Sequence, residues 1–203
     1  MRSPERPLER GGLDVRLDPA VPDPLTPYSG PYITRPDASG QFLLHDVFPG
    51  KYRLSAIQRQ ATGWFQDLTT IPGADVSGQL VDVKGQDVAG LTVTLTDQRG
   101  EISGSIMTEK GEPAPEYFIL LYPSDEKYWS SYSLRLRGTR ANQDGRFVID
   151  GVPAGTYRLA RILDVEFGAW FDPAYLRRID PGAMTVTFAG DEKKTVNLRV
   201  PDM

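Results

Sequence analysis

The stretch Gly40-Gln-Phe-Leu-Leu-His-Asp-Val-Phe-Pro-Gly-Lys-Tyr-Arg-Leu54 returns later in the chain as Gly145-Arg-Phe-Val-Ile-Asp-Gly-Val-Pro-Ala-Gly-Thr-Tyr-Arg-Leu159. The two stretches align without a gap at an offset of 105 residues, and seven of their fifteen positions are identical. Both alternate apolar and polar residues, pass through a Pro/Gly turn and alternate again. This pattern predicts a β-hairpin in each copy, and the fixed offset predicts an internal repeat.

The offset holds outside these hairpins as well. Trp64-Phe65 falls on Trp170-Phe171 after a one-residue insertion, which predicts a shared core role for the two tryptophans. Since successive strand residues face opposite sides of a sheet, a duplicated domain keeps the phase of every strand. The offset sets Leu13, Val15 and Leu17 on Phe118, Leu120 and Tyr122, and it sets Leu91, Val93 and Leu95 on Val196, Leu198 and Val200. The side chains that we expect to be buried at matched positions are Phe42, Tyr52 and Leu54 with Phe147, Tyr157 and Leu159.

The apolar pattern predicts an all-β fold in two domains, residues 1–98 and 99–203. No long stretch keeps a helical period, and 20 glycines and 17 prolines punctuate the whole chain. A short helix is expected after Asp172 as N-cap, with Pro173 at its first position. Strands of the second domain are expected at 101–108, 116–122, 132–140, 145–150, 156–163, 183–189 and 194–200. Such spacing predicts a seven-stranded Greek-key β-sandwich, and the repeat predicts two in tandem.

The first domain is expected to lack its opening strand. Carried back by the offset, the strand expected at 101–108 would fall at or before Met1. Either the chain is part of a longer protein or another segment fills that sheet edge, because an unpaired edge invites association. The start, Met1–Gly12, is a poor strand, since Pro4 and Pro7 cannot donate ladder hydrogen bonds. Pairing with a second chain, as in a homodimer, is therefore favoured.

The composition excludes several classes of function. A formal net charge of −4 and a pI near 5.1 offer no electrostatic footprint for nucleic acid. The absence of cysteine excludes disulfides, thiolate nucleophiles and thiolate metal sites. No apolar run approaches the roughly 20 residues of a membrane-spanning helix, and the start of the chain lacks the apolar segment of a signal peptide.

Three motifs of the second domain are Ile102-Ser-Gly-Ser-Ile with Gly111-Glu-Pro113, residues 144–159 and Trp170-Phe-Asp-Pro-Ala-Tyr-Leu176. Through these motifs the chain resembles the carboxypeptidase regulatory-like domains of the transthyretin-like superfamily. Residues 40–54 and 87–95 repeat the pattern in the first domain. The resemblance implies seven-stranded sandwiches that recur in large exported bacterial proteins, and hence an extracellular or periplasmic location. It implies no catalytic residue, metal or cofactor.

A candidate binding site lies around the loop before the third strand of the second domain. Flat aromatic rings on a sandwich surface can stack sugar rings, and the alternation over residues 132–137 places Leu134 and Leu136 inward and the arginines outward. Outward arginines could meet an acidic partner or a glycan. The residues of this candidate site are Tyr122, Tyr128, Trp129, Tyr132, Arg135 and Arg137.

Three functional classes remain open: a non-catalytic spacer or interaction module, a carbohydrate-binding module using Trp129, and a small hydrolase with paired carboxylates. His45, the only histidine, aligns with Asp150 beside a turn, which disfavours a catalytic triad. Oxygen-rich loops can hold calcium, but Asp and Asn beside glycine are more typical of turns. The acids in question are Asp37, Asp46, Asp144 and Asp150. The partners expected are a carbohydrate or another protein.

Overall fold

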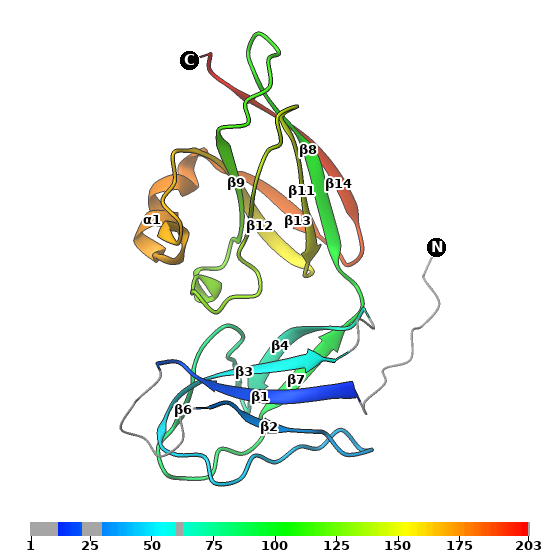
Figure 1. The fold of residues 1–203 in the computed structure, drawn as a ribbon, viewed down its shortest axis with the longest axis vertical. Coiled ribbons are helices and arrows are strands. Elements are labelled where there is room, and N and C mark those ends of the chain that lie inside the picture. The colour runs from blue at the N-terminus through cyan, green and yellow to red at the C-terminus, as the bar shows by residue number, and fades with distance from the viewer. Residues whose placement is uncertain (1–11, 22–29, 60–62, 203) are drawn as a thin grey trace. The chain divides into compact units, whose positions relative to one another are not determined.

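The computed structural model describes residues 12–21, 30–59 and 63–202, and nearly all of their regular structure is β-strand (Figure 1). The predicted all-β sandwich fold is confirmed. Contacts along the chain group into two units, Met1–Asp97 and Gln98–Met203, called unit 1 and unit 2 below. No helix in the described part of the chain is long and apolar enough to cross a membrane.

Unit 2 is built from two sheets. The strands are β8 (Gly100–Thr108), β9 (Tyr117–Pro123), β10 (Arg137–Arg140), β11 (Arg146–Val152), β12 (Gly155–Leu163), β13 (Met184–Phe188) and β14 (Lys193–Val200). One sheet has the order β10-β9-β12-β13, and the other has the order β11-β8-β14, in which β14 runs parallel to β8. The third strand begins at Arg137 and not at Tyr132 as predicted, because residues 131–135 form turns.

The main core of unit 2 lies between these sheets. Alternate residues of each strand point into it, as the period of a half-buried strand requires. Members from one sheet are Ile119, Leu121, Tyr157, Leu159, Val186 and Phe188, and members from the other are Ile102, Ile106, Phe147, Ile149, Leu198 and Val200. Phe147, Tyr157 and Leu159 are thus buried as predicted.

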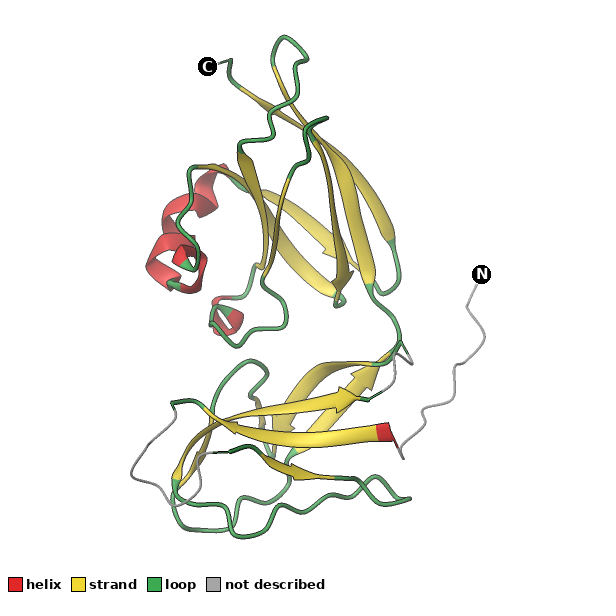
Figure 2. Ribbon diagram, viewed as in Figure 1, coloured by secondary structure: helices red, strands yellow, loops and turns green. Residues whose placement is uncertain are grey.

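The outer face of sheet β10-β9-β12-β13 is also covered. The predicted short helix is α1 (Pro173–Ile179), and the Asp172 side chain caps it by accepting from the Ala174 N–H. Two 3₁₀ turns, η3 (Ala169–Phe171) and η4 (Asp180–Gly182), flank α1. Figure 2 shows these helical segments in red on the side of the sheet away from β8 and β14. Beneath them lies a second apolar layer, which includes Leu120, Tyr122, Trp129, Ala160, Ile162 and Leu176.

Unit 1 also has two sheets. Its strands are β1 (Leu13–Pro19), β2 (Tyr32–Thr34), β3 (Gly50–Gln58), β4 (Phe65–Ile71), β5 (Ala74–Asp75), β6 (Val81–Val83) and β7 (Thr92–Thr96). The sheet orders are β2-β1-β3-β6 and β5-β4-β7. The buried centre of its core is Val15, Leu17, Tyr52 and Leu54, with Phe42, Leu44, Val81 and Val93 half-buried around it.

Several pairings of unit 1 recur in unit 2 at the 105-residue offset. In β3 and β6, Tyr52 lies opposite Val81, and in β12 and β13 Tyr157 lies opposite Val186. The first strand departs by one residue, because Leu17 pairs with Leu54 whereas Leu121 pairs with Leu159. The predicted match of Leu13, Val15 and Leu17 with Phe118, Leu120 and Tyr122 is therefore wrong. Their structural equivalents are Tyr117, Ile119 and Leu121, because a one-residue slip moves every side chain of a strand to the opposite face.

The described residues of unit 1 include no counterpart of the opening strand β8. Strand β7 pairs antiparallel with β4, whereas its counterpart β14 pairs with the opening strand β8. These pairings do not test the homodimer expected at this edge, which stays a prediction. Residues 1–11 of the alternative cover lie outside the described residues. Residues 41–47 form no strand, and β11 and β12 pair in different sheets of unit 2, so the predicted β-hairpin is wrong in both copies. Phe42, which was predicted to be buried, is half-buried.

The segment of unit 1 that forms β4 folds differently from its counterpart in unit 2, which follows β12. The outer face of β1 carries Asp14, Arg16 and Asp18, and Arg59 lies 2.7 Å from Asp14 in an ion pair. Such a face offers no apolar surface for a helix to cover. In unit 1 this segment therefore forms a hairpin of β4 and β5, and β4 pairs with β7. In unit 2 its counterpart forms helical turns that cover the apolar outer face of β9. Trp64 lies ahead of β4 and Trp170 in η3, so the predicted equivalence of their roles is wrong.

Candidate functional site

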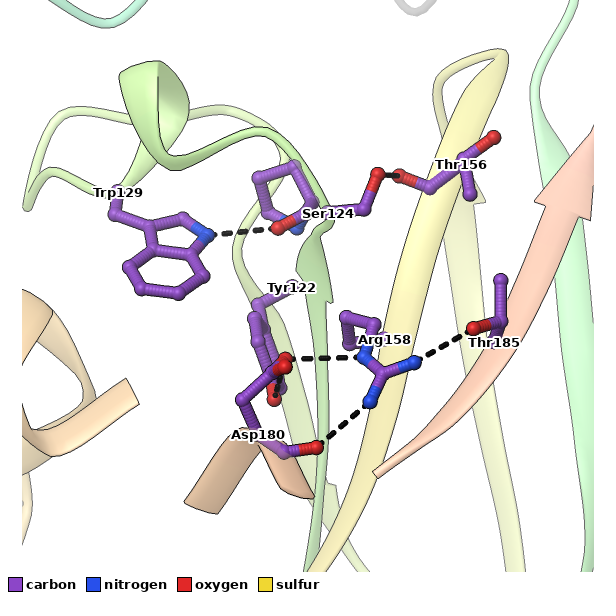
Figure 3. A network of polar contacts seen from close by, with 8 residues as sticks. Tyr122, Ser124, Trp129, Thr156, Arg158, Asp180 and Thr185 are labelled. Carbon is purple, nitrogen blue, oxygen red and sulfur yellow. Dashed lines mark hydrogen bonds and ion pairs between the residues drawn. The ribbon is translucent and has the colours of Figure 1, made fainter. Parts of the chain in front are cut away.

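Two aromatic residues of the predicted site, Tyr122 and Trp129, are buried instead of lying on the surface. The 3₁₀ turn η2 (Glu126–Tyr128) follows β9, and Asp125 caps it by accepting from the Lys127 N–H. Trp129 comes next and is only 6% exposed. Its indole N–H donates to the Pro123 carbonyl at 2.7 Å, and its ring meets Tyr122 edge-on at 5.7 Å (Figure 3). The prediction of an exposed sugar-stacking face at Trp129 is wrong, because the ring is needed to fill the second apolar layer.

A polar network fastens η4 to the sheet at the rim of this layer. The hydroxyl of Tyr122 donates to Asp180 Oδ1 at 3.0 Å. The Arg158 guanidinium donates to the same oxygen at 3.0 Å, to the Asp180 carbonyl at 2.7 Å and to Thr185 Oγ1 at 2.6 Å (Figure 3). One arginine thus joins β12, β13 and the end of the helical cap. The network has a structural role, because the Tyr122 hydroxyl and all three guanidinium nitrogens of Arg158 donate to groups within the unit.

We expect Tyr122 to make stability fall at high pH. Burial raises the pKa of Tyr122 above its ordinary value of 10.0, and the bond to Asp180 raises it further. Above pH 10 the unfolded chain loses this proton while the folded chain keeps it, so the free energy of unfolding declines as pH rises through the folded pKa. Tyr122→Phe should cost about 1 kcal/mol at pH 8 through the lost hydrogen bond. Urea unfolding at pH 8, 10 and 11 should show that difference shrinking, and a constant difference would contradict it.

Arg135 is buried and not outward as predicted. It is 8% exposed, and Nη1 donates to the Ala154 carbonyl at 2.7 Å and to the Tyr157 hydroxyl at 3.3 Å. Its guanidinium also lies 5.0 Å from the centre of the Tyr128 ring. Leu134, expected inside, is 41% exposed. The alternation failed here because residues 131–135 form turns, where the period of a strand does not apply.

The remaining residues of the predicted site are also engaged within unit 2. Arg137 donates to the Gly151 carbonyl at 3.4 Å, which Arg99 also contacts at 2.8 Å. Tyr128 and Tyr132 are half-buried. Tyr122 contacts Trp129, and Tyr128 contacts Arg135. Both contacts hold parts of unit 2 together. Any ligand-binding role of these six residues stays a prediction.

The acids proposed for calcium form turns where their contacts are described. Asp37 Oδ1 accepts from the N–H groups of Ser39 and Gln41, at 2.8 and 3.0 Å. The Ser39 side chain and these amides lower the pKa of Asp37. Asn142, which is 105 residues further on, accepts in the same way from Asp144 and Arg146. Among the described residues no group of three acids or histidines is placed to hold a metal ion, and His45 is exposed.

Sequence reasoning missed an aromatic stack on the outer face of unit 2. The ring of Trp170 stacks on Phe118 at 4.7 Å, and Phe167 meets Trp170 edge-on at 5.4 Å. Phe167 is 91% exposed. Its position ahead of Gly168, in a stretch rich in turn residues, was the available signal.

The sequence matches no family model and no curated protein. Solved structures similar to it include a candidate carbohydrate binding protein from Pseudomonas aeruginosa, with 18% identity over 51% of this chain and 89% of that one and a TM-score of 0.32. The minor pilin GBS52 of Streptococcus agalactiae has 14% identity over 94% and 83%, with a TM-score of 0.35. The 5-hydroxyisourate hydrolase of Klebsiella pneumoniae has 20% identity over 50% and 87%, with a TM-score of 0.26. These identities and TM-scores are too low to carry an argument about function.

Proposed function

We propose that the chain is a tandem of two copies of one β-sandwich module, and that the pair acts as a non-catalytic spacer or binding unit of a larger exported bacterial protein. The observation that carries the first part is a shared hydrogen bond. The hydroxyl of Tyr52 donates to the Phe48 carbonyl at 2.7 Å, and that of Tyr157 donates to the Pro153 carbonyl at 2.8 Å. Both bonds reach back four residues, to the loop ahead of β3 in unit 1 and to the turn between β11 and β12 in unit 2. A buried tyrosine hydroxyl usually finds such a hydrogen-bond partner.

Two further features support a common module. The pairings of β3 with β6 recur residue for residue in β12 with β13. The turn closed by Asp37 recurs at Asn142 with the same acceptor geometry. Agreement at the levels of turn, register and side-chain bond is the consistency expected of a duplicated fold.

A spacer or binding role accounts for the use of the polar side chains. Tyr122, Arg135 and Arg158 are candidates for binding or catalysis by residue type, yet each is engaged in bonds that hold a loop or helix to a sheet. Groups spent on such bonds cannot reorganise around a substrate without loosening the fold. The exported location and the carboxypeptidase regulatory-like assignment extend the resemblance noted from the sequence.

The non-catalytic part is tested with the full chain on panels of ester, glycoside and peptide substrates. We expect turnover no faster than in buffer. His45→Ala is the matched variant, because His45 is exposed and its removal should leave the fold intact. Turnover by the parent chain that disappears in this variant would assign a hydrolase and refute the proposal.

A further inference from the structure

Three aromatic residues of unit 2 form a partly exposed stack, called the aromatic platform: Phe118, Trp170 and Phe167. Phe118 and Trp170 are half-buried at its base, while Phe167 at the tip is 91% exposed. A large aromatic ring held in solvent gives up the stabilisation that burial would provide. This loss points to a use for the ring outside the fold.

The base of the platform is packed, and the backbone that carries Phe167 is hydrogen-bonded. The Phe118 ring lies against Gly138 of the neighbouring strand, where a Cβ atom would stand only 2.3 Å from the ring. The loop carrying Phe167 turns through Gly168, which has a φ of 89°. The Ala169 N–H donates to the Glu166 carbonyl at 3.1 Å, and the Phe171 N–H donates to the Gly168 carbonyl at 2.9 Å. A loop backbone that is ordered before binding loses less conformational entropy when a ligand arrives.

Polar groups adjoin the platform. Within residues 63–202 the Trp170 indole N–H makes no hydrogen bond. It is also not one of the buried polar atoms without a partner, so this N–H is in contact with solvent. The Arg140 guanidinium lies 6.0 Å from the centre of the Phe118 ring. Glu166, next to Phe167 in the chain, is exposed. A positive group therefore lies beside Phe118 and a negative group adjoins Phe167 in the chain, so charges of both signs border the platform.

We propose that the aromatic platform binds a sugar ring of a neutral polysaccharide, stacked on Phe167 and hydrogen-bonded at its rim by the Trp170 indole. A pyranose presents one face of C–H bonds, which packs on an aromatic ring, and an edge of hydroxyls that exchange hydrogen bonds with such a rim. Charges of both signs beside the ring give no preference for an anionic sugar. A protein partner needs about 800 Å² on each side, far more than one exposed ring provides. This proposal rests on the binding role proposed above.

Affinity gel electrophoresis of the full chain tests the proposal, with a soluble mixed-linkage β-glucan, xylan or mannan cast in the gel. We expect retardation by at least one of them and an apparent Kd about tenfold higher for Phe167→Ala, through loss of the stacked ring. Trp170→Phe keeps the stack but removes the indole N–H and should weaken binding by a smaller factor. Val148→Ala is the matched control, because Val148 is 54% exposed on the other sheet of unit 2, and its binding should stay unchanged.

Two results would overturn the proposal: no retardation by any of the three polysaccharides, or equal retardation of the parent chain and Phe167→Ala. Self-association of the parent chain in analytical ultracentrifugation that Phe167→Ala abolishes would likewise overturn it, by assigning the ring to a protein contact. Release of reducing ends during the binding assay would instead refute the non-catalytic function, so the two failures are distinguishable.

Discussion

Gly104→Ala is expected to destabilise unit 2 by about 4 kcal/mol or more. Gly104 lies in β8, the central strand of its sheet, with Val196 of β14 beside it and Phe147 of β11 on the other side. A Cβ atom at this position would stand 1.7 Å from the Val196 carbonyl oxygen and 2.7 Å from its carbon. Both are backbone atoms of a paired strand, so no side chain can rotate away. The added methyl group can be accommodated only by opening the ladder between β8 and β14.

Gly182→Ala is the matched control for this substitution. Gly182 also belongs to unit 2, but a Cβ atom there meets nothing within 4 Å. Urea unfolding followed by circular dichroism should place the control within about 0.5 kcal/mol of the parent chain. A Gly104→Ala protein as stable as the control would mean that β8 and β14 are not paired as described.

Tyr157→Ala should cost about 3–5 kcal/mol, the range for removing a large buried aromatic side chain. Tyr157 is fully buried between the sheets of unit 2. Its ring meets Phe188 edge-on at 5.9 Å, and its hydroxyl donates to the Pro153 carbonyl and accepts from Arg135. Truncation therefore leaves a cavity and takes one partner from each of two buried polar groups.

Calorimetry of the full chain measures this effect and separates the units. We expect the transition of unit 2 to move down in temperature while that of unit 1 keeps its position, since each unit has its own core. Tyr157→Phe, which removes only the hydroxyl, should cost about 1 kcal/mol. Equal shifts of both transitions in Tyr157→Ala would show that the units do not unfold separately.

The strands β11 and β12 of unit 2 were predictable because their sequence carries two independent signals. Within residues 145–150 and 156–163 apolar residues recur at every second position, at Phe147 and Ile149 and at Tyr157 and Leu159, and the turn between the two ranges contains Pro and Gly. β11 and β12 occupy those ranges within two residues. The face of β9 was harder to predict, because Tyr117 to Tyr122 are all apolar and burial on both sides removes the alternation that marks a single inner face.

The candidate site was less predictable than the fold. The aromatic residues around Trp129 are ambiguous in sequence, because a ring that binds a ligand and a ring that fills a core have the same composition. The sequence does not show that the outer face of β9 is covered. That cover determines whether the rings are buried or available to a ligand. Phe167 lies ahead of Gly168, whose φ is 89°, and its side chain is 91% exposed, whereas Trp129 packs into the apolar layer.

The partner of the last strand has a consequence for folding rates. In unit 2, β14 reaches back to β8, and Lys193 pairs with Glu101, 92 residues earlier. In unit 1, β7 pairs with β4, and the partners are 22 to 31 residues apart, as Thr70 with Thr92 and Phe65 with Thr96. Closing a longer loop costs more chain entropy before any contact repays it. Unit 1 can therefore complete its sheets through local steps, whereas unit 2 must wait for its two ends to meet.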